Sequence, residues 1–165
     1  MIPRVAVLVV AHAPLASALG ACAEHVYACA PEALGALALL DVAPNADVTG
    51  EVAKALAAIK LIERERGVLV LTDLFGSTPA NVAVQLAEPG RIEVVTGVNL
   101  PMLLGALCYS DQLNVVTLAE KAVKGGTSGV IKLAATPQQN QRGARAASPA
   151  TDNEDHASTR LQDQQ

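Results

Sequence analysis

The sequence predicts an α/β fold in which an open, mainly parallel β-sheet of about four strands carries helices on both faces. Short apolar runs rich in Val, Leu and Ile alternate along the chain with longer segments of helical periodicity. Within each run, apolar residues do not alternate with polar ones. Such continuous apolar runs are typical of strands buried on both faces of a parallel sheet. With 165 residues, the chain has the length of one domain.

The expected strands are apolar runs bounded by polar or turn-forming residues. The clearest begins the chain, where Arg4-Val-Ala-Val-Leu-Val-Val10 is apolar and largely β-branched. In chain order the expected strands cover residues 4–10, 34–40, 68–71 and 92–96, with a short last strand at 130–133.

The expected helices have apolar residues at spacings of three and four. The first starts at Leu15 and is closed by Pro31. Its predicted buried face consists of Leu15, Leu19, Cys22, Val26 and Cys29. The second follows the capping candidate Asp47 and ends at Gly67. Its predicted buried face consists of Val48, Val52, Leu56, Ile59 and Ile62.

Three shorter helices complete the expected pattern. One covers residues 79–86, one starts near Leu100, and one covers residues 113–123, where Gly125-Gly126 should stop it. From residue 135 onwards the composition changes to Gln, Asn, Arg, Ser, Asp, Pro and Ala. Such a segment cannot bury enough apolar surface to offset the entropy of ordering. We therefore expect a domain over residues 1–134 and a disordered polar tail over residues 135–165.

Composition narrows the range of functions. Apolar residues make up 51% of the chain, but its aromatic residues are only Phe75, Tyr27 and Tyr109, so the core must be aliphatic. The net charge of −4 and the shortage of aromatic rings disfavour nucleic-acid binding. No apolar run is long enough to span a bilayer, and the apolar N-terminus lacks a secretory cleavage pattern, so a cytoplasmic location is expected.

The cysteines and the outlying histidines are not expected to bind a metal. Cys22, Cys29 and Cys108 lack the short paired spacings of zinc sites, and their apolar surroundings indicate small buried side chains. His25 falls on a predicted helix and His156 in the polar tail. The Walker and GxGxxG motifs are also absent from the sequence, so no cofactor is expected.

Candidate functional residues follow the expected strands, because open α/β sheets bind ligands at the carboxyl ends of their strands. His12 lies there after the first strand, and Asp73 lies at the equivalent place after the third. A carboxylate that accepts a hydrogen bond from one imidazole nitrogen leaves the other free as a nucleophile, and it stabilises the cationic phosphoimidazole. His12 is therefore a candidate phosphoryl acceptor. The alternative is a structural histidine beside a turn or capping aspartate.

The loop after Asp73 offers donors for a phosphoryl group. The proline after Thr78 suits the first position of a helix, so Thr78 is the expected N-cap, with free backbone N–H groups pointing outward. Gly76 permits close backbone approach, and the hydroxyls of Ser77 and Thr78 are neutral donors. No Lys or Arg occurs at positions 5–53 or 67–90.

Asn99 and Pro101 belong to the third strand-end loop. Asn99 precedes Leu100-Pro101 and is the expected cap of the next helix. We assign both residues to loop support or to a partner interface.

Three motifs together resemble the IIA component of the mannose-type phosphoenolpyruvate-dependent sugar phosphotransferase system. They are Val9-Val-Ala-His12, Asp73-Leu-Phe-Gly-Ser-Thr-Pro-Ala-Asn81 and Gly97-Val-Asn-Leu-Pro-Met-Leu103. The resemblance implies a phosphotransferase with a phosphohistidine intermediate, in which His12 accepts the phosphoryl group from HPr and Asp73 orients the ring. A IIB component would then receive the group for sugar uptake. The resemblance also implies a homodimer that exchanges the strand at residues 130–133.

The sequence departs from this family in two places. The family usually has Gly-Gly-Ser before the proline, where this chain has Gly76-Ser77-Thr78, so Ser77 would be strained if the second glycine needs a positive φ. Fused members continue into a IIB domain, whereas this chain ends in the polar tail, so a IIB partner is expected to be a separate protein or to be missing.

Two further functions use the same residues. One is a stand-alone regulatory phosphocarrier with no transport role. The other is the phosphoryl-donor subunit of a dihydroxyacetone kinase, which the motifs starting at Asp73 and Gly97 match less well than they match the sugar-transport family.

Overall fold

The computed structural model describes residues 3–63 and 66–132, which form four strands, five α-helices and a short 3₁₀ turn. The strands are β1 (Ala6–His12), β2 (Leu37–Val42), β3 (Val68–Thr72) and β4 (Ile92–Thr96). The helices are α1 (Leu15–Val26), α2 (Val48–Ile62), α3 (Thr78–Leu86), α4 (Leu100–Tyr109) and α5 (Val115–Ser128), with the 3₁₀ turn η1 at Pro31–Leu34. Each of these helices is too short or too polar to cross a membrane.

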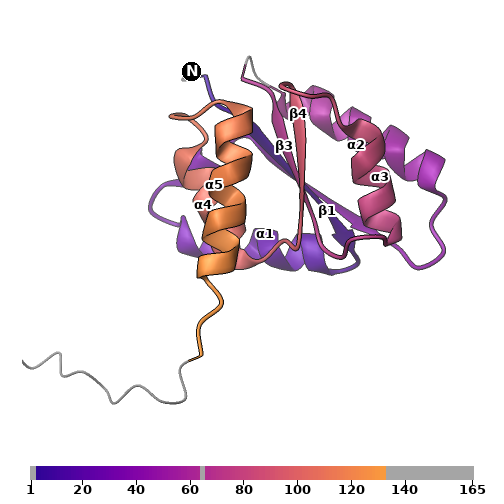
Figure 1. The fold of residues 1–165 in the computed structure, drawn as a ribbon, viewed down its shortest axis with the longest axis horizontal. Helices are drawn as coiled ribbons and strands as arrows, with labels where there is room; N and C mark the ends of the chain where they lie inside the picture. The colour runs from indigo at the N-terminus through magenta and orange to yellow at the C-terminus, as the bar shows by residue number, and fades with distance from the viewer. Residues whose placement is uncertain (1–2, 64–65, 133–165) are drawn as a thin grey trace, which may run out of the picture. The chain divides into compact units, whose positions relative to one another are not determined.

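The four strands form one parallel sheet in the order β2-β1-β3-β4. Helices α2 and α3 pack against one face of the sheet, and α1, α4 and α5 pack against the other (Figure 1). The predicted open parallel sheet with helices on both faces is therefore confirmed.

The central strands β1 and β3 are buried because helices cover both of their faces. Every residue of β3 and the first six of β1 are fully buried, and all but one of these side chains are aliphatic. Full burial of one Val or Leu side chain stabilises the fold by about 1.5–3 kcal/mol. Successive side chains of a strand point to opposite faces, so His12 continues the row of Ala6, Leu8 and Val10 on the α2 and α3 side.

The expected strand boundaries were close to the observed ones. The strand expected at 92–96 is confirmed in full as β4, and β3 extends the expected strand 68–71 by one residue. The expected strand 4–10 starts and ends two residues later as β1, and 34–40 shifts to Leu37–Val42 because η1 occupies Pro31–Leu34.

The predicted buried face of α1 is confirmed at Leu19 and was wrong at its other positions. The residues buried in this helix are Ala16, Leu19, Gly20 and Ala23, whereas Leu15 and Val26 are exposed. Small side chains face the sheet because the helix lies so close to it. A Cβ on Gly20 would lie 2.2 Å from Cδ1 of Leu39 on β2.

The cysteines are also exposed, which corrects the expectation that they are small core residues. Cys22 lies on the outer face of α1, Cys29 lies beyond the end of that helix, and Cys108 lies on α4. Helical periodicity alone could not separate the two faces of α1, since apolar or small residues occupy both.

Helix α2 begins as predicted and ends earlier than predicted. Asp47 is its N-cap, and its carboxylate accepts a hydrogen bond from the Gly50 N–H at 2.8 Å. The helix ends at Ile62, well before Gly67. Its buried residues include Ile59, as expected, but Leu56 is exposed.

Helix α5 continues through the two glycines that were expected to stop it. It runs to Ser128 because small residues let its last turn lie close to the start of α4. A Cβ on Gly126 would lie 2.6 Å from Cε of Met102, and one on Gly129 would lie 2.6 Å from Cγ of Pro101.

The segment after α5 carries no strand in its described part. Residues 130–132 have no regular secondary structure and no strand partner, whereas a strand at 130–133 was expected. Leu133, the domain boundary at 134 and the predicted tail 135–165 lie outside the described residues.

Candidate functional site

Three loops meet at the carboxyl edge of the sheet. His12 is the last residue of β1, and Asp73 directly follows β3. The loop after β4 is joined to them by backbone hydrogen bonds, since Gly97 N–H donates to the Asp73 carbonyl at 2.8 Å and Val98 N–H donates to the Thr72 carbonyl at 2.9 Å. The strand-end loops that the sequence indicated therefore lie together at the carboxyl edge of the sheet.

His12 and Asp73 contact each other directly. The Oδ2 atom of Asp73 accepts hydrogen bonds from His12 Nδ1 at 2.7 Å and from the His12 backbone N–H at 2.9 Å. An ionised carboxylate can only accept, so Nδ1 carries a proton in this contact and Nε2 of the neutral ring is the unprotonated nitrogen. The His12 side chain is 50% exposed and that of Asp73 only 12%. A fixed, half-exposed ring with a free nitrogen is a competent nucleophile.

The environment of Asp73 keeps it ionised. Burial alone would raise the pKa of the Asp73 carboxyl. The hydrogen bonds from the backbone N–H groups of His12 and Leu74, together with the His12 ring, outweigh burial and hold this pKa below its ordinary value. The carboxylate is therefore negatively charged throughout the neutral range and can stabilise a positive charge on the His12 ring.

Asp41, at the end of β2, supports the His12 loop from the other side. Its Oδ1 accepts hydrogen bonds from the N–H groups of Ala16 at 2.9 Å and Ser17 at 3.2 Å, and its Oδ2 accepts one from the Ser17 hydroxyl. Asp41 thereby caps the first turn of α1 from a different element, since α1 has no side-chain cap of its own. Sequence analysis missed this residue, although a carboxylate near the end of an apolar strand was the available signal.

The turn after Asp73 is held by Ser77. The Ser77 N–H and hydroxyl both donate to the Leu74 carbonyl, at 3.1 Å and 2.7 Å. Gly76 has a φ of +81°, which only glycine adopts without strain. Ser77 has a φ of −83°, so the strain that its substitution for glycine suggested does not arise.

The start of α3 differs from the prediction at Thr78. Ser77 occupies the N-cap position and Thr78 is already helical, because Pro79 is accommodated one place further along than expected. The Ser77 hydroxyl is engaged by Leu74, so no side chain caps this helix. The first turn of α3 consequently keeps free donors of the kind that bind anions.

Asn99 caps α4, as expected from the sequence. Its Oδ1 accepts a hydrogen bond from Met102 N–H at 3.0 Å, and its Nδ2 donates to the Gly97 carbonyl at 3.1 Å and to the Gly126 carbonyl at 3.5 Å. Pro101, two residues further on, lies against the glycines at the end of α5. Both residues thus fix the third loop of the site to α5.

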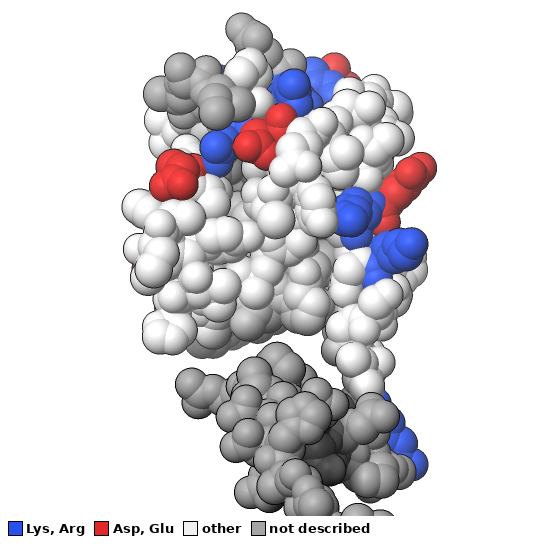
Figure 2. Space-filling view, turned by 90° about the vertical axis from the view of Figure 1, so that its left-hand side faces the viewer, with Lys and Arg blue, Asp and Glu red and all other residues white. Residues whose placement is uncertain are grey.

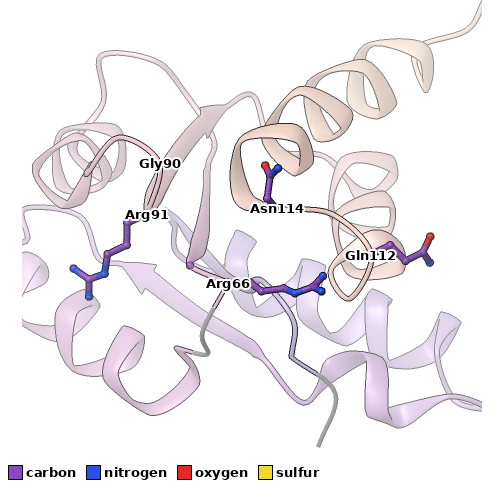
Figure 3. A pocket seen from close by; sticks show the side chains of 6 residues that line it. Arg66, Gly90, Arg91, Gln112 and Asn114 are labelled. Atoms are coloured by element: carbon purple, nitrogen blue, oxygen red, sulfur yellow. The ribbon is translucent and has the colours of Figure 1, made fainter.

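A cleft of about 510 Å³ lies at the opposite, amino-terminal end of the strands, lined by Arg66, Gly67, Gly90, Arg91, Gln112 and Asn114 (Figure 3). Arg91 forms ion pairs with Glu63 and Glu88 at 2.9 Å and 2.6 Å. Figure 3 shows the side chains of Arg66 and Arg91 pointing away from each other. This cleft therefore lacks converging charges, and within residues 3–63 and 66–132 no cluster of His, Cys, Asp and Glu side chains suits a metal ion.

Comparisons with known proteins agree with the motifs at this edge. A family model described as "PTS system fructose IIA component" matches residues 6–123. The mannose-specific EIIAB component of Escherichia coli K12 is 32% identical over 110 residues, which are 66% of this chain and 34% of that protein. The matched part is thus about a third of the relative's length. The fructose-specific EIIA component of Bacillus subtilis is 46% identical over 57 residues, covering 34% of this chain and 39% of the relative.

Solved structures resemble the whole described fold. The mannose/sorbose-specific IIA subunit from Enterococcus faecalis superimposes with a TM-score of 0.69 at 26% identity, over 83% of this chain and 99% of that one. The IIA protein associated with the fucose utilization operon of Streptococcus pneumoniae gives a TM-score of 0.66 at 24% identity, over 80% and 96% of the two chains.

Proposed function

The chain belongs to the mannose-type family of PTS EIIA components, and from that premise we propose that it carries a phosphoryl group on His12 between two other proteins of a sugar uptake system. The donor is HPr and the acceptor is a IIB component. The observation that carries this proposal is the contact between His12 Nδ1 and Asp73 Oδ2 at 2.7 Å beside a half-exposed ring.

The transfer step uses His12 Nε2 as the nucleophile. Its lone pair forms a bond to the phosphorus of the phosphohistidine on HPr, and the N–P bond of the donor breaks with its electron pair returning to the donor ring. The His12 ring keeps its Nδ1 proton and becomes cationic. The hydrogen bond to ionised Asp73 then joins two charged groups, and hydrogen bonds to charged groups contribute about 1.5–3 kcal/mol. The same steps in reverse deliver the group to IIB.

The surroundings of His12 suit a carrier that must release its cargo. Positions 5–53 and 67–90 contain no Lys or Arg. Because the Ser77 hydroxyl already donates to the Leu74 carbonyl, the neutral donors proposed for the phosphoryl group are the Thr78 hydroxyl and the first backbone N–H groups of α3. Neutral donors and a helix N-terminus stabilise a phosphoryl group without the strong ion pairs that fixed cations would form.

A homodimer is part of the same proposal. Strand β4 lies at one edge of the sheet, and Val130 and Ile131 after α5 are apolar and 82% and 70% exposed. We propose that residues 130–133 of one subunit pair with the edge of β4 in the other. Pairing would cover apolar side chains and satisfy strand-edge backbone groups together.

Phosphoryl labelling tests the proposed function. Incubation with phosphoenolpyruvate, enzyme I and HPr should label the protein with an acid-labile, base-stable group, because a phosphoramidate bond hydrolyses once protonated. The substitution His12→Ala should abolish the label, and the matched control His25→Ala should leave it unchanged, since His25 is an exposed residue near the end of α1. Addition of a IIB domain should remove the label. A label that persists in His12→Ala contradicts the proposal.

A retained label in the presence of IIB would separate the candidate functions. A phosphohistidine that IIB cannot remove would favour the regulatory carrier over the transport role, because both use His12 and differ only in the acceptor.

A further inference from the structure

The turn beside the site presents two large apolar side chains to solvent. Leu74 is 65% exposed and Phe75, the single phenylalanine of the chain, is 82% exposed. Both directly follow Asp73. A lone exposed apolar residue is ordinary, but an adjacent pair at a functional edge calls for an explanation.

The position of Phe75 is fixed by hydrogen bonds and not by packing. The Ser77 N–H donates to the Leu74 carbonyl, and Gly76 has a φ of +81°, the arrangement of a type II turn with Phe75 at its first central position. The turn is tied to the site because Leu74 N–H donates to Asp73 Oδ1 at 2.7 Å. Because the turn already fixes the backbone at Phe75, little backbone freedom is lost when a partner protein covers its ring.

The surroundings of this ring match the centre of a protein interface. Within the three loops at residues 12–14, 73–78 and 97–101, Asp73 is the one acidic residue and Lys and Arg are absent. Interface centres are poor in charged residues and rich in aromatic ones. Figure 2 views the domain from the left-hand side of Figure 1, and on that face charged side chains gather at the upper end and along the right-hand edge.

We propose that Phe75, supported by Leu74, is the apolar anchor on which the phosphoryl-exchanging proteins dock. This inference rests on the proposed function. The reacting atoms must come within about 3–3.5 Å of each other, and a stable protein interface covers about 800 Å² on each partner. A partner centred on His12 therefore covers the turn that follows Asp73, whose carboxylate is 2.7 Å from the ring. The matching surface on the partner protein is an apolar pocket beside the partner's phosphorylated side chain.

Docking and chemistry can be separated by using two donors. With phospho-HPr as donor, Phe75→Ala should raise KM for His12 labelling at least about tenfold with little change in kcat, as expected for loss of an interface anchor. With potassium phosphoramidate, a small donor that needs no docking, Phe75→Ala should be labelled at the wild-type rate. Phe75→Tyr should stay close to wild type with both donors, because the ring is retained.

The matched control is Leu61→Ala. Leu61 is 79% exposed, comparable to Phe75, but it lies at the end of α2 and so at the opposite edge of the sheet. Its removal should leave KM for phospho-HPr unchanged.

Three outcomes would overturn the anchor proposal. They are an unchanged KM of Phe75→Ala for phospho-HPr, an equal slowing with phosphoramidate, and a loss of self-association in Phe75→Ala, which would assign the ring to a second copy of the chain. Failure of the proposed function looks different, since wild-type His12 would then accept no label from phospho-HPr or phosphoramidate.

Discussion

At the scale of single residues, the site depends on how Asp73 divides its contacts. One oxygen accepts from both the ring and the backbone of His12, and the other accepts from Leu74 N–H. The carboxylate therefore fixes the histidine tautomer, the end of β1 and the start of the turn at once. Its 12% exposure means that water does little to screen the charge it offers to the ring.

Replacing Asp73 by Asn should slow transfer without abolishing it. The amide keeps the shape but loses the charge, and its NH₂ group would favour the wrong tautomer of His12. We expect the labelling rate with phospho-HPr to fall by about 10²–10⁴-fold, with full labelling still reached at long times. Rapid-quench measurement of labelling gives this rate.

Asp47→Asn is the matched control for that change. Asp47 is another carboxylate near the carboxyl edge, and it caps α2 without touching His12. Since Asn is an equally good N-cap, its labelling rate should equal that of wild type. Equal rates for Asp73→Asn and wild type would rule out a role of the Asp73 charge.

Sequence reasoning at this scale succeeded where a residue's position along a strand decides its place. His12 and Asp73 lie at one edge because the carboxyl ends of parallel strands coincide there. The role of Asp41 and the N-cap position of Ser77 were not foreseen. The role of Asp41 depends on contacts between separate elements, and the position of Ser77 depends on the exact turn before α3. A local sequence pattern specifies neither.

At the scale of elements, α4 and α5 hold the third loop of the site through glycine contacts. Asn99 bonds to Gly126, and the last turn of α5 packs on Pro101 and Met102. A sequence rule that treats Gly-Gly as a helix stop failed here because close packing against a neighbouring helix outweighs the low helix propensity of glycine.

Two alanine substitutions should separate packing from propensity in α5. A Cβ on Gly125 would meet no atom closer than 3.8 Å, whereas one on Gly126 would lie 2.6 Å from Met102 Cε and 3.1 Å from Asn99 Nδ2. Gly125→Ala should therefore raise the free energy of unfolding by up to about 1 kcal/mol. Gly126→Ala should be less stable than Gly125→Ala by about 1–3 kcal/mol, owing to overpacking. Urea titration measures both, and equal stabilities would contradict the packing argument.

At the scale of the whole molecule, the fold followed from the sequence because its strands are so uniformly apolar. Runs such as β1 and β3 can be buried only between two helical layers, and the intervening helical segments supply those layers. The face of α1 and the end of α5 could not be predicted in the same way. Small residues allow close approach of neighbouring elements, and hydrophobic periodicity carries no information about that distance.

The oligomeric state is the prediction that belongs to this scale. Edge strands with open backbone groups favour pairing with another chain, and β4 has one strand neighbour, β3, among the described residues. Exchange of residues 130–133 would give a dimer of twice the 16.9 kDa chain mass. Sedimentation equilibrium at about 10 μM, well above the Kd of a stable interface, should therefore report that mass.

Ile131→Pro tests whether this segment forms the interface. Proline removes a backbone N–H that strand pairing needs, yet Ile131 lies beyond α5 and is exposed, so the isolated subunit should fold as before. We expect the variant to sediment as a monomer, while the matched control Ile131→Val, which retains β propensity, stays dimeric. Phosphoramidate should still label His12 in the monomer, because the Asp73 carboxylate that holds that ring belongs to the same subunit. A wild-type protein that sediments as a monomer, or an Ile131→Pro variant that remains a dimer, would refute strand exchange.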